Sequence, residues 1–150
     1  MADGVYFEDL VAGQIFRGSR EIVMERDRIV AFAREFDPHP GHVGEDTAAD
    51  SAFGELVASG WHTASTASRL MTEALPVAGG GMGGSVEVRW LTPVRPGDAL
   101  RVEIEVMSLR PSATRPHLGI VRMRTAILNQ RDEEVATLNS TNFLPRRGAG

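Results

Sequence analysis

The sequence predicts a single α+β domain in which helices come first and an antiparallel sheet follows. In the first half of the chain, apolar residues recur at three- and four-residue spacing, which is typical of helices. In the second half they alternate with polar residues, and short connections separate the alternating segments. Strands joined by short loops pair largely antiparallel, because parallel pairing needs long crossovers. The 150 residues suit one domain, over residues 1–150, with a sizeable core.

The first half begins with an edge segment over residues 5–14 and a strand over 15–23. A helix is predicted over 24–36, with its apolar residues on one face. Pro38 ends this helix, since the residue before a proline is disfavoured in the helical conformation. A short helix with acidic residues in its first turn is expected over 45–53.

A second long helix is expected from about Trp61 to Leu75. Small side chains dominate the first two turns of its apolar face, so this helix can lie close against a broad, flat partner. The predicted buried face consists of Ala64, Ala67, Leu70, Met71 and Ala74. An antiparallel sheet with one apolar face needs such a cover. The sequence therefore predicts this helix packed on the sheet.

The second half reads as a series of strands after a glycine-rich loop over residues 77–84. The alternation predicts strands over 85–90, around 102–106, around 121–127 and over 135–144. Residues 146–150 are expected to form a disordered tail.

Composition excludes several classes of protein. The net charge is −4, and the cations are sixteen scattered arginines with no lysine, which argues against a nucleic-acid surface, a P-loop and Schiff-base chemistry. There is no cysteine to act as a nucleophile. No apolar run is long enough to cross a bilayer, and the first four residues lack the features of a signal peptide. We therefore expect a cytoplasmic protein without membrane or nucleic-acid partners.

The candidate site is the loop Phe36–Val43, which holds Asp37, His39 and His42, with two prolines that stiffen the backbone between them. A carboxylate and an imidazole held side by side can transfer protons at neutral pH. Asp37 could instead cap a turn, and His42 alone could be a structural hydrogen bonder. Ligands for zinc are too few, so we expect no metal site.

Four motifs carry a resemblance to a known family. They are Asp37 followed by Pro40 and His42, then Phe53–Gly54, then Ala58–Thr63, and finally Pro93–Asp98. Because these motifs occur in this order, the chain resembles the MaoC-type acyl dehydratases, which are hotdog proteins and include the R-specific enoyl-CoA hydratases. The resemblance runs from about residue 6 to residue 147 and implies an antiparallel sheet wrapped around a long central helix.

The resemblance also implies an activity and its residues. Asp37 and His42 would activate the water that adds to a 2-enoyl thioester, or that leaves a 3-hydroxyacyl thioester. The backbone N–H of Gly60 would hold the thioester oxygen. Trp61 would either line the acyl pocket or fill the core, and Ser68 matches a serine that some members place near the catalytic pair. The thioester would be on CoA or acyl carrier protein, no cofactor is expected, and the chain would form a homodimer or a dimer of dimers.

This chain departs from the commoner family pattern at three positions, His39, Gly41 and Gly44. We expect Gly41 to loosen the loop and His39 to be a specificity or structural variant. Two alternatives stay open. A hotdog thioesterase would need a carboxylate on the central helix, where Glu73 is the nearest candidate. A non-catalytic acyl-CoA binder, or a subunit of a heteromeric hydratase, would need only the pocket.

Overall fold

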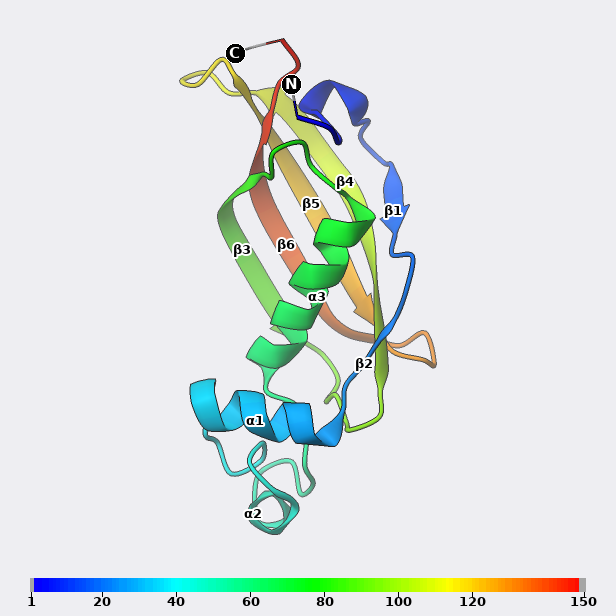
Figure 1. Ribbon diagram of the computed structural model, residues 1–150, viewed down its shortest axis with the longest axis vertical. Coiled ribbons are helices and arrows are strands. Elements are labelled where there is room, and N and C mark those ends of the chain that lie inside the picture. The colour runs from blue at the N-terminus through cyan, green and yellow to red at the C-terminus, as the bar shows by residue number, and fades with distance from the viewer. Residues whose placement is uncertain (1, 149–150) are drawn as a thin grey trace.

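The computed structural model describes residues 2–148 and shows an antiparallel sheet with one long helix lying across its inner face (Figure 1). The helices are η1 (Phe7–Asp9), α1 (Arg26–Phe36), α2 (Glu45–Ala49) and α3 (Gly60–Ala74). The strands are β1 (Ile15–Arg17), β2 (Ile22–Val23), β3 (Met82–Trp90), β4 (Ala99–Pro111), β5 (Leu118–Leu128) and β6 (Glu134–Pro145). The predicted α+β class and the helix on the sheet are confirmed.

The sheet has the order β1-β4-β5-β6-β3, with β2 also paired to β4, and every strand pair is antiparallel. The strands from β4 to β6 follow one another along the chain, as their short turns require. β3 instead pairs with β6, the last strand, and so forms one edge of the sheet. That long-range pairing is not visible in the local sequence pattern.

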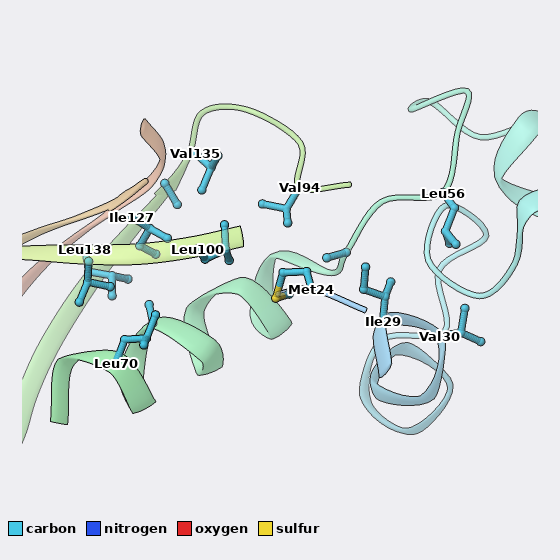
Figure 2. Packing of buried hydrophobic residues seen from close by; sticks show 14 of the residues in the cluster. Met24, Ile29, Val30, Leu56, Leu70, Val94, Leu100, Ile127, Val135 and Leu138 are labelled. Atoms are coloured by element: carbon cyan, nitrogen blue, oxygen red, sulfur yellow. The ribbon is translucent and has the colours of Figure 1, made fainter. Parts of the chain in front are cut away.

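The main core lies between α3 and the inner face of the sheet (Figure 2). Leu70 projects from α3 toward Leu100, Ile127 and Leu138, and these side chains are almost fully buried. Ala67, one turn earlier on α3, is also fully buried, and its small size allows the helix to approach the sheet. The same core continues past the start of α3 to α1, so α1 and the sheet share one apolar interior.

α1 and α2 lie at the end of the molecule where α3 begins (Figure 1). Arg26 at the start of α1 forms two hydrogen bonds to the carboxylate of Glu45 at the start of α2, at 2.6 and 2.7 Å. The Asp37–Gly44 loop connects these two helices and is thereby held beside the first turn of α3. Two segments that are distant in sequence thus meet at one place.

Several predicted boundaries shift in the structure. The strand predicted over 15–23 is two short strands, because β1 and β2 pair with different stretches of β4. The first helix begins at Arg26, since the backbone of Met24 is bonded to the turn before β4 through Gly97 and Asp98. The short second helix ends at Ala49. The predicted glycine-rich loop is shorter, because β3 already begins at Met82.

Residues 146–148 of the predicted disordered tail lie within the described part of the chain. The backbone N–H of Arg146 donates to the carbonyl of His117 at 3.0 Å, and the guanidinium of Arg147 forms an ion pair with Asp9. These contacts join the end of β6 to the turn before β5 and to η1. Residues 149–150 lie outside the described residues.

Candidate active site

Asp37 stands where α1 ends. Its N–H donates to the carbonyl of Ala33 at 2.9 Å, which closes the helix, but its own backbone has left the helical conformation. Pro38 accounts for this change, because a proline disfavours the helical conformation in the residue before it. The carboxylate is therefore aimed out of the helix, and about one-third of the Asp37 side chain is exposed.

His42 is buried, and a hydrogen bond through its Nδ1 atom fixes its ring. Its Nδ1 lies 2.7 Å from the carbonyl oxygen of Val57. A carbonyl can only accept a hydrogen bond, so Nδ1 carries the proton in the neutral ring. Nε2 is then the free base, and it lies 3.7 Å from Oδ2 of Asp37. This separation is too long for a direct hydrogen bond and suits a water molecule held by both groups.

Ser59 connects this pair to the central helix, a role that we did not predict from the sequence. Its hydroxyl donates to Oδ2 of Asp37 at 2.7 Å, and Oγ of Ser59 also accepts a hydrogen bond from the N–H of Trp61 at 3.2 Å. Ser59 is thus the N-cap of α3 and is fully buried. A serine just before a helix is a recognised capping signal. That signal was available in the sequence, but the contact with Asp37 was not.

Gly60 supplies the first backbone N–H of α3 and lines the same cavity as Asp37 and His42. The first N–H groups of a helix have no acceptor inside it, and the helix dipole adds partial positive charge there. The indole of Trp90 lies so close to Gly60 that a Cβ at this position would overlap it. Only glycine therefore allows this approach of β3 to the helix start.

The loop is tight at Gly41, and the expectation that this glycine loosens it is wrong. The N–H of Gly41 donates to Nδ1 of His39 at 3.0 Å, and its carbonyl accepts from the N–H of Val57 at 3.0 Å. A Cβ at Gly41 would come within 2.8 Å of the Phe53 ring. The ring of Phe53 also lies 5.6 Å from that of His42, centroid to centroid. The aromatic ring therefore fills the space beside the glycine.

These groups surround a cavity of about 330 Å³, which lies in the usual size range of small-molecule sites. Its walls come from the loop, from the start of α3 and from the end of β3 with the residues that follow it. They include Asp37, His42, Phe53, Gly60, Trp61, Thr63, Trp90 and Val94. Trp61 packs edge-on against Trp90, with 5.2 Å between the ring centroids. The structure thus brings together four of the five predicted site residues.

Ser68 is the fifth predicted site residue and does not line this cavity. It lies two turns further along α3, in a groove that adjoins the cavity at Trp61. Among residues 2–148, no three side chains of the usual metal-binding types lie close enough together to hold a metal ion. No helix in that part of the chain is both long and apolar enough to cross a membrane.

His62 faces away from the cavity and stacks on Phe32, with ring centroids 4.7 Å apart. Its Nδ1 is buried without a hydrogen-bond partner. Burial lowers the pKa of His62 below its ordinary value, and the positive charge of Arg28 lowers it further. His62 therefore stays uncharged and packs between the two long helices.

Comparison with known proteins identifies the family of this chain. Residues 9–126 match the family model described as the MaoC like domain. The chain belongs to the MaoC-like domain family. It is 35% identical over 116 residues to 3-hydroxybutyryl-CoA dehydratase from Methylorubrum extorquens, covering 77% of this chain and 72% of that protein.

Two solved structures of the family show the same fold. A MaoC-like dehydratase from Rhodospirillum rubrum superposes with a TM-score of 0.91 and 43% identity, covering 96% of this chain and 99% of that one. The R-hydratase PhaJ1 from Pseudomonas aeruginosa gives a TM-score of 0.78 and 26% identity, covering 96% and 88%. The hotdog architecture implied by the sequence motifs is thereby confirmed. The family contains hydratases and dehydratases, and this chain has the fold that they use.

Proposed function

We propose that this MaoC-like protein is a hydro-lyase that adds water to 2-enoyl thioesters of CoA or acyl carrier protein, or removes it from 3-hydroxyacyl thioesters. The observation that carries this proposal is the 3.7 Å separation of Nε2 of His42 and Oδ2 of Asp37 in a cavity that also contains the first N–H of α3. One relative is named 3-hydroxybutyryl-CoA dehydratase, and that name describes a reaction of the same class.

In the hydration direction, the two side chains hold one water molecule between them. His42 accepts a proton from this water through Nε2 while the water oxygen bonds to the β-carbon of the substrate. Negative charge then builds on the thioester oxygen, where the N–H of Gly60 and the helix dipole stabilise it. A proton from the Asp37–His42 pair completes the reaction at the α-carbon. Dehydration follows the same steps in reverse.

The thioesterase alternative depends on Glu73, and the structure gives that carboxylate other partners. Arg20 forms two hydrogen bonds to it at 2.8 Å each, and Arg69 adds a third at 3.2 Å. The hydrogen bonds from Arg20 hold the pKa of Glu73 at about 2, which makes it a poor base. Glu73 also lies about 20 Å along α3 from Gly60, at about 1.5 Å per residue.

The test is hydration of crotonyl-CoA, followed by the loss of the enoyl absorbance. Asp37→Asn and His42→Ala should each reduce the rate by about 100- to 10,000-fold, the usual contribution of general acid–base groups. Asp50→Asn and His117→Ala are the matched controls, because both side chains are exposed and neither lines the cavity. Activity that survives both Asp37→Asn and His42→Ala would refute the mechanism. Tight acyl-CoA binding without turnover by the wild-type protein would favour the binding alternative.

We also propose that the chain forms a homodimer through β3. Within residues 2–148, this strand pairs on one side only, with β6. It exposes the apolar side chains of Met82, Val86 and Trp90. A sheet edge of this kind is prone to pair with another strand. Light scattering should give twice the monomer mass or a multiple of it, and a monomeric mass would refute the pairing.

A further inference from the structure

His39 closes a turn in the Asp37–Gly44 loop through its ring. The N–H of Gly41, two residues further along the chain, donates to Nδ1 of His39 at 3.0 Å. Asparagine and aspartate close turns in the same way, because Oδ1 of their side chain accepts from the N–H two residues on. Nδ1 of histidine is separated from Cα by the same number of bonds as that oxygen. His39 therefore forms such a turn with an acceptor that can itself bind a proton.

Hydrogen bonds lead from this turn to the ring of His42. The carbonyl of Gly41 accepts from the N–H of Val57 at 3.0 Å, and the carbonyl of Val57 accepts from Nδ1 of His42 at 2.7 Å. The N–H of His42 also donates to the carbonyl of His39 at 2.9 Å. The ring of His42 is thus oriented by a carbonyl whose own residue is bonded to Gly41. The turn at His39 therefore supports the position of Nε2 of His42 beside Asp37.

The ring of His39 is exposed, whereas the groups that it holds are buried. Gly41 and His42 are both buried. The ring centroid of His39 lies 4.9 Å from that of His42 and 6.0 Å from that of Phe53. Solvent protons can therefore reach His39 without any opening of the loop.

The hydrogen bond to Gly41 exists only while the ring of His39 is neutral. A backbone N–H can only donate, so Nδ1 lacks a proton and the ring proton is on Nε2. A protonated imidazole donates from both nitrogens. Its Nδ1–H would then face the N–H of Gly41, and this buried N–H would lose its acceptor. Imidazole side chains ordinarily change charge between about pH 5 and pH 8, which lies within the range of an ordinary assay.

The surroundings of His39 offer its ring no paired carboxylate. Among residues 2–148, the ring forms no ion pair, and Ser51 and Phe53, which follow α2 and lie against this turn, are uncharged. The ionisable side chains on the loop and on α2, together with the residue that ends it, are Asp37, His42, Glu45, Asp46 and Asp50. Asp37 and His42 face each other, and Glu45 is bonded to Arg26. Within the described residues, an ion pair therefore does not replace the hydrogen bond that protonation removes.

We propose that His39 is a positioning residue for His42, which holds the loop while its ring is neutral and releases it when the ring is protonated. This inference rests on the proposed function, since it assigns the orientation of the proposed base to a neighbouring side chain. His39 itself does not line the cavity, so it acts through the turn alone. The consequence is a loss of hydration toward acidic pH in addition to the loss caused by protonation of His42.

Three variants separate the acceptor from the ring. His39→Asn keeps an acceptor at the same place but cannot be protonated near neutral pH, and His39→Phe keeps a ring but has no acceptor. His117→Asn is the matched control, because His117 is an exposed histidine in the turn before β5. At about pH 8, His39→Phe should lower kcat for crotonyl-CoA by about 10- to 100-fold, the effect of a misplaced catalytic group. His39→Asn should retain the wild-type kcat.

The pH profile of the same proteins tests the protonation. Between about pH 8 and pH 5.5, kcat of the wild type should fall about 10- to 100-fold further than that of His39→Asn. Protonation of His42 lowers kcat in both proteins, so it does not account for the difference. His117→Asn should follow the wild type.

The amide signal of Gly41 in ¹⁵N-labelled protein gives a readout that needs no turnover. In the wild type, its proton signal should move upfield as the pH falls, because the hydrogen bond to His39 is lost. In His39→Asn, this signal should stay in place, since the amide oxygen remains an acceptor at every pH of the series.

Three results would overturn the inference. The fall of kcat with pH could be equal in the wild type and in His39→Asn, or kcat of His39→Phe could equal that of the wild type at about pH 8. The Gly41 signal could move equally in the wild type and in His39→Asn. If the wild type hydrates no enoyl-CoA, the proposed function fails, while the Gly41 signal still decides whether His39 holds the turn.

Discussion

Replacing Ser59 with alanine tests whether one hydroxyl group joins the carboxylate of Asp37 to the central helix. The substitution removes the N-cap of α3, which costs about 1 kcal/mol in typical helices. It also removes the hydrogen bond to Asp37, and bonds to charged groups contribute about 1.5–3 kcal/mol. Because about one-third of the Asp37 side chain is exposed, water can replace part of that bond. We therefore expect a loss of about 2–3 kcal/mol in the free energy of unfolding, measured by urea denaturation.

The activity of the Ser59→Ala protein should fall as well, because the carboxylate is no longer held toward Nε2 of His42. We expect kcat to drop by about 10- to 100-fold, the effect of a small misplacement of a catalytic group. Ser65→Ala is the matched control, since its hydroxyl donates only to the carbonyl of Trp61 on the exposed side of α3. A double-mutant cycle that combines Ser59→Ala with Asp37→Asn measures the coupling energy between these two side chains. A coupling energy near zero together with an unchanged kcat would refute the reasoning.

Three further predictions concern close packing and pH. Gly60→Ala should lower the free energy of unfolding, measured by urea denaturation, by about 1–3 kcal/mol and should slow the hydration of crotonyl-CoA. Trp90→Ala in the same chain should remove the overlap and restore part of that free energy. Gly41→Ala should be destabilising by a similar amount, and a smaller residue at Phe53 should restore stability. The pKa of His62 is lowered in the folded state, so the unfolded chain binds the proton first and stability is lost as pH falls through 6.5. His62→Phe should flatten this loss in thermal unfolding at successive pH values, and an unchanged slope would contradict it.

The local elements were predictable because their causes are local. The period-two alternation in β4 and the helical spacing in α1 both reflect burial of one face, which the sequence records directly. The end of α1 at Phe36 follows from Pro38 alone. The start of α1 was misplaced by two residues because Met24 is bonded to the turn around Gly97, which is distant in the sequence. A pattern of neighbouring residues carries no information about such a contact.

The candidate site was predictable in its residue types but not in its connections. Asp37 and His42 stand at a spacing that the family resemblance identifies, and the structure places Nε2 of His42 3.7 Å from Oδ2 of Asp37. Ser59 was missed as a partner of Asp37, because a capping motif predicts only its bond to the helix backbone. Ser68 was predicted near the pair, but two turns of helix separate it from the cavity.

The start of α3 is where the fold and the proposed chemistry depend on the same atoms. One oxygen, Oγ of Ser59, caps the start of α3 by accepting from the N–H of Trp61 and positions the carboxylate of Asp37 by donating to it. The next residue, Gly60, has no side chain, so its N–H remains open to the cavity while Trp90 packs against it. A larger residue at position 60 would overlap the indole of Trp90 and crowd the backbone N–H that faces the cavity. Stability and activity are therefore expected to fall together when either Ser59 or Gly60 is replaced.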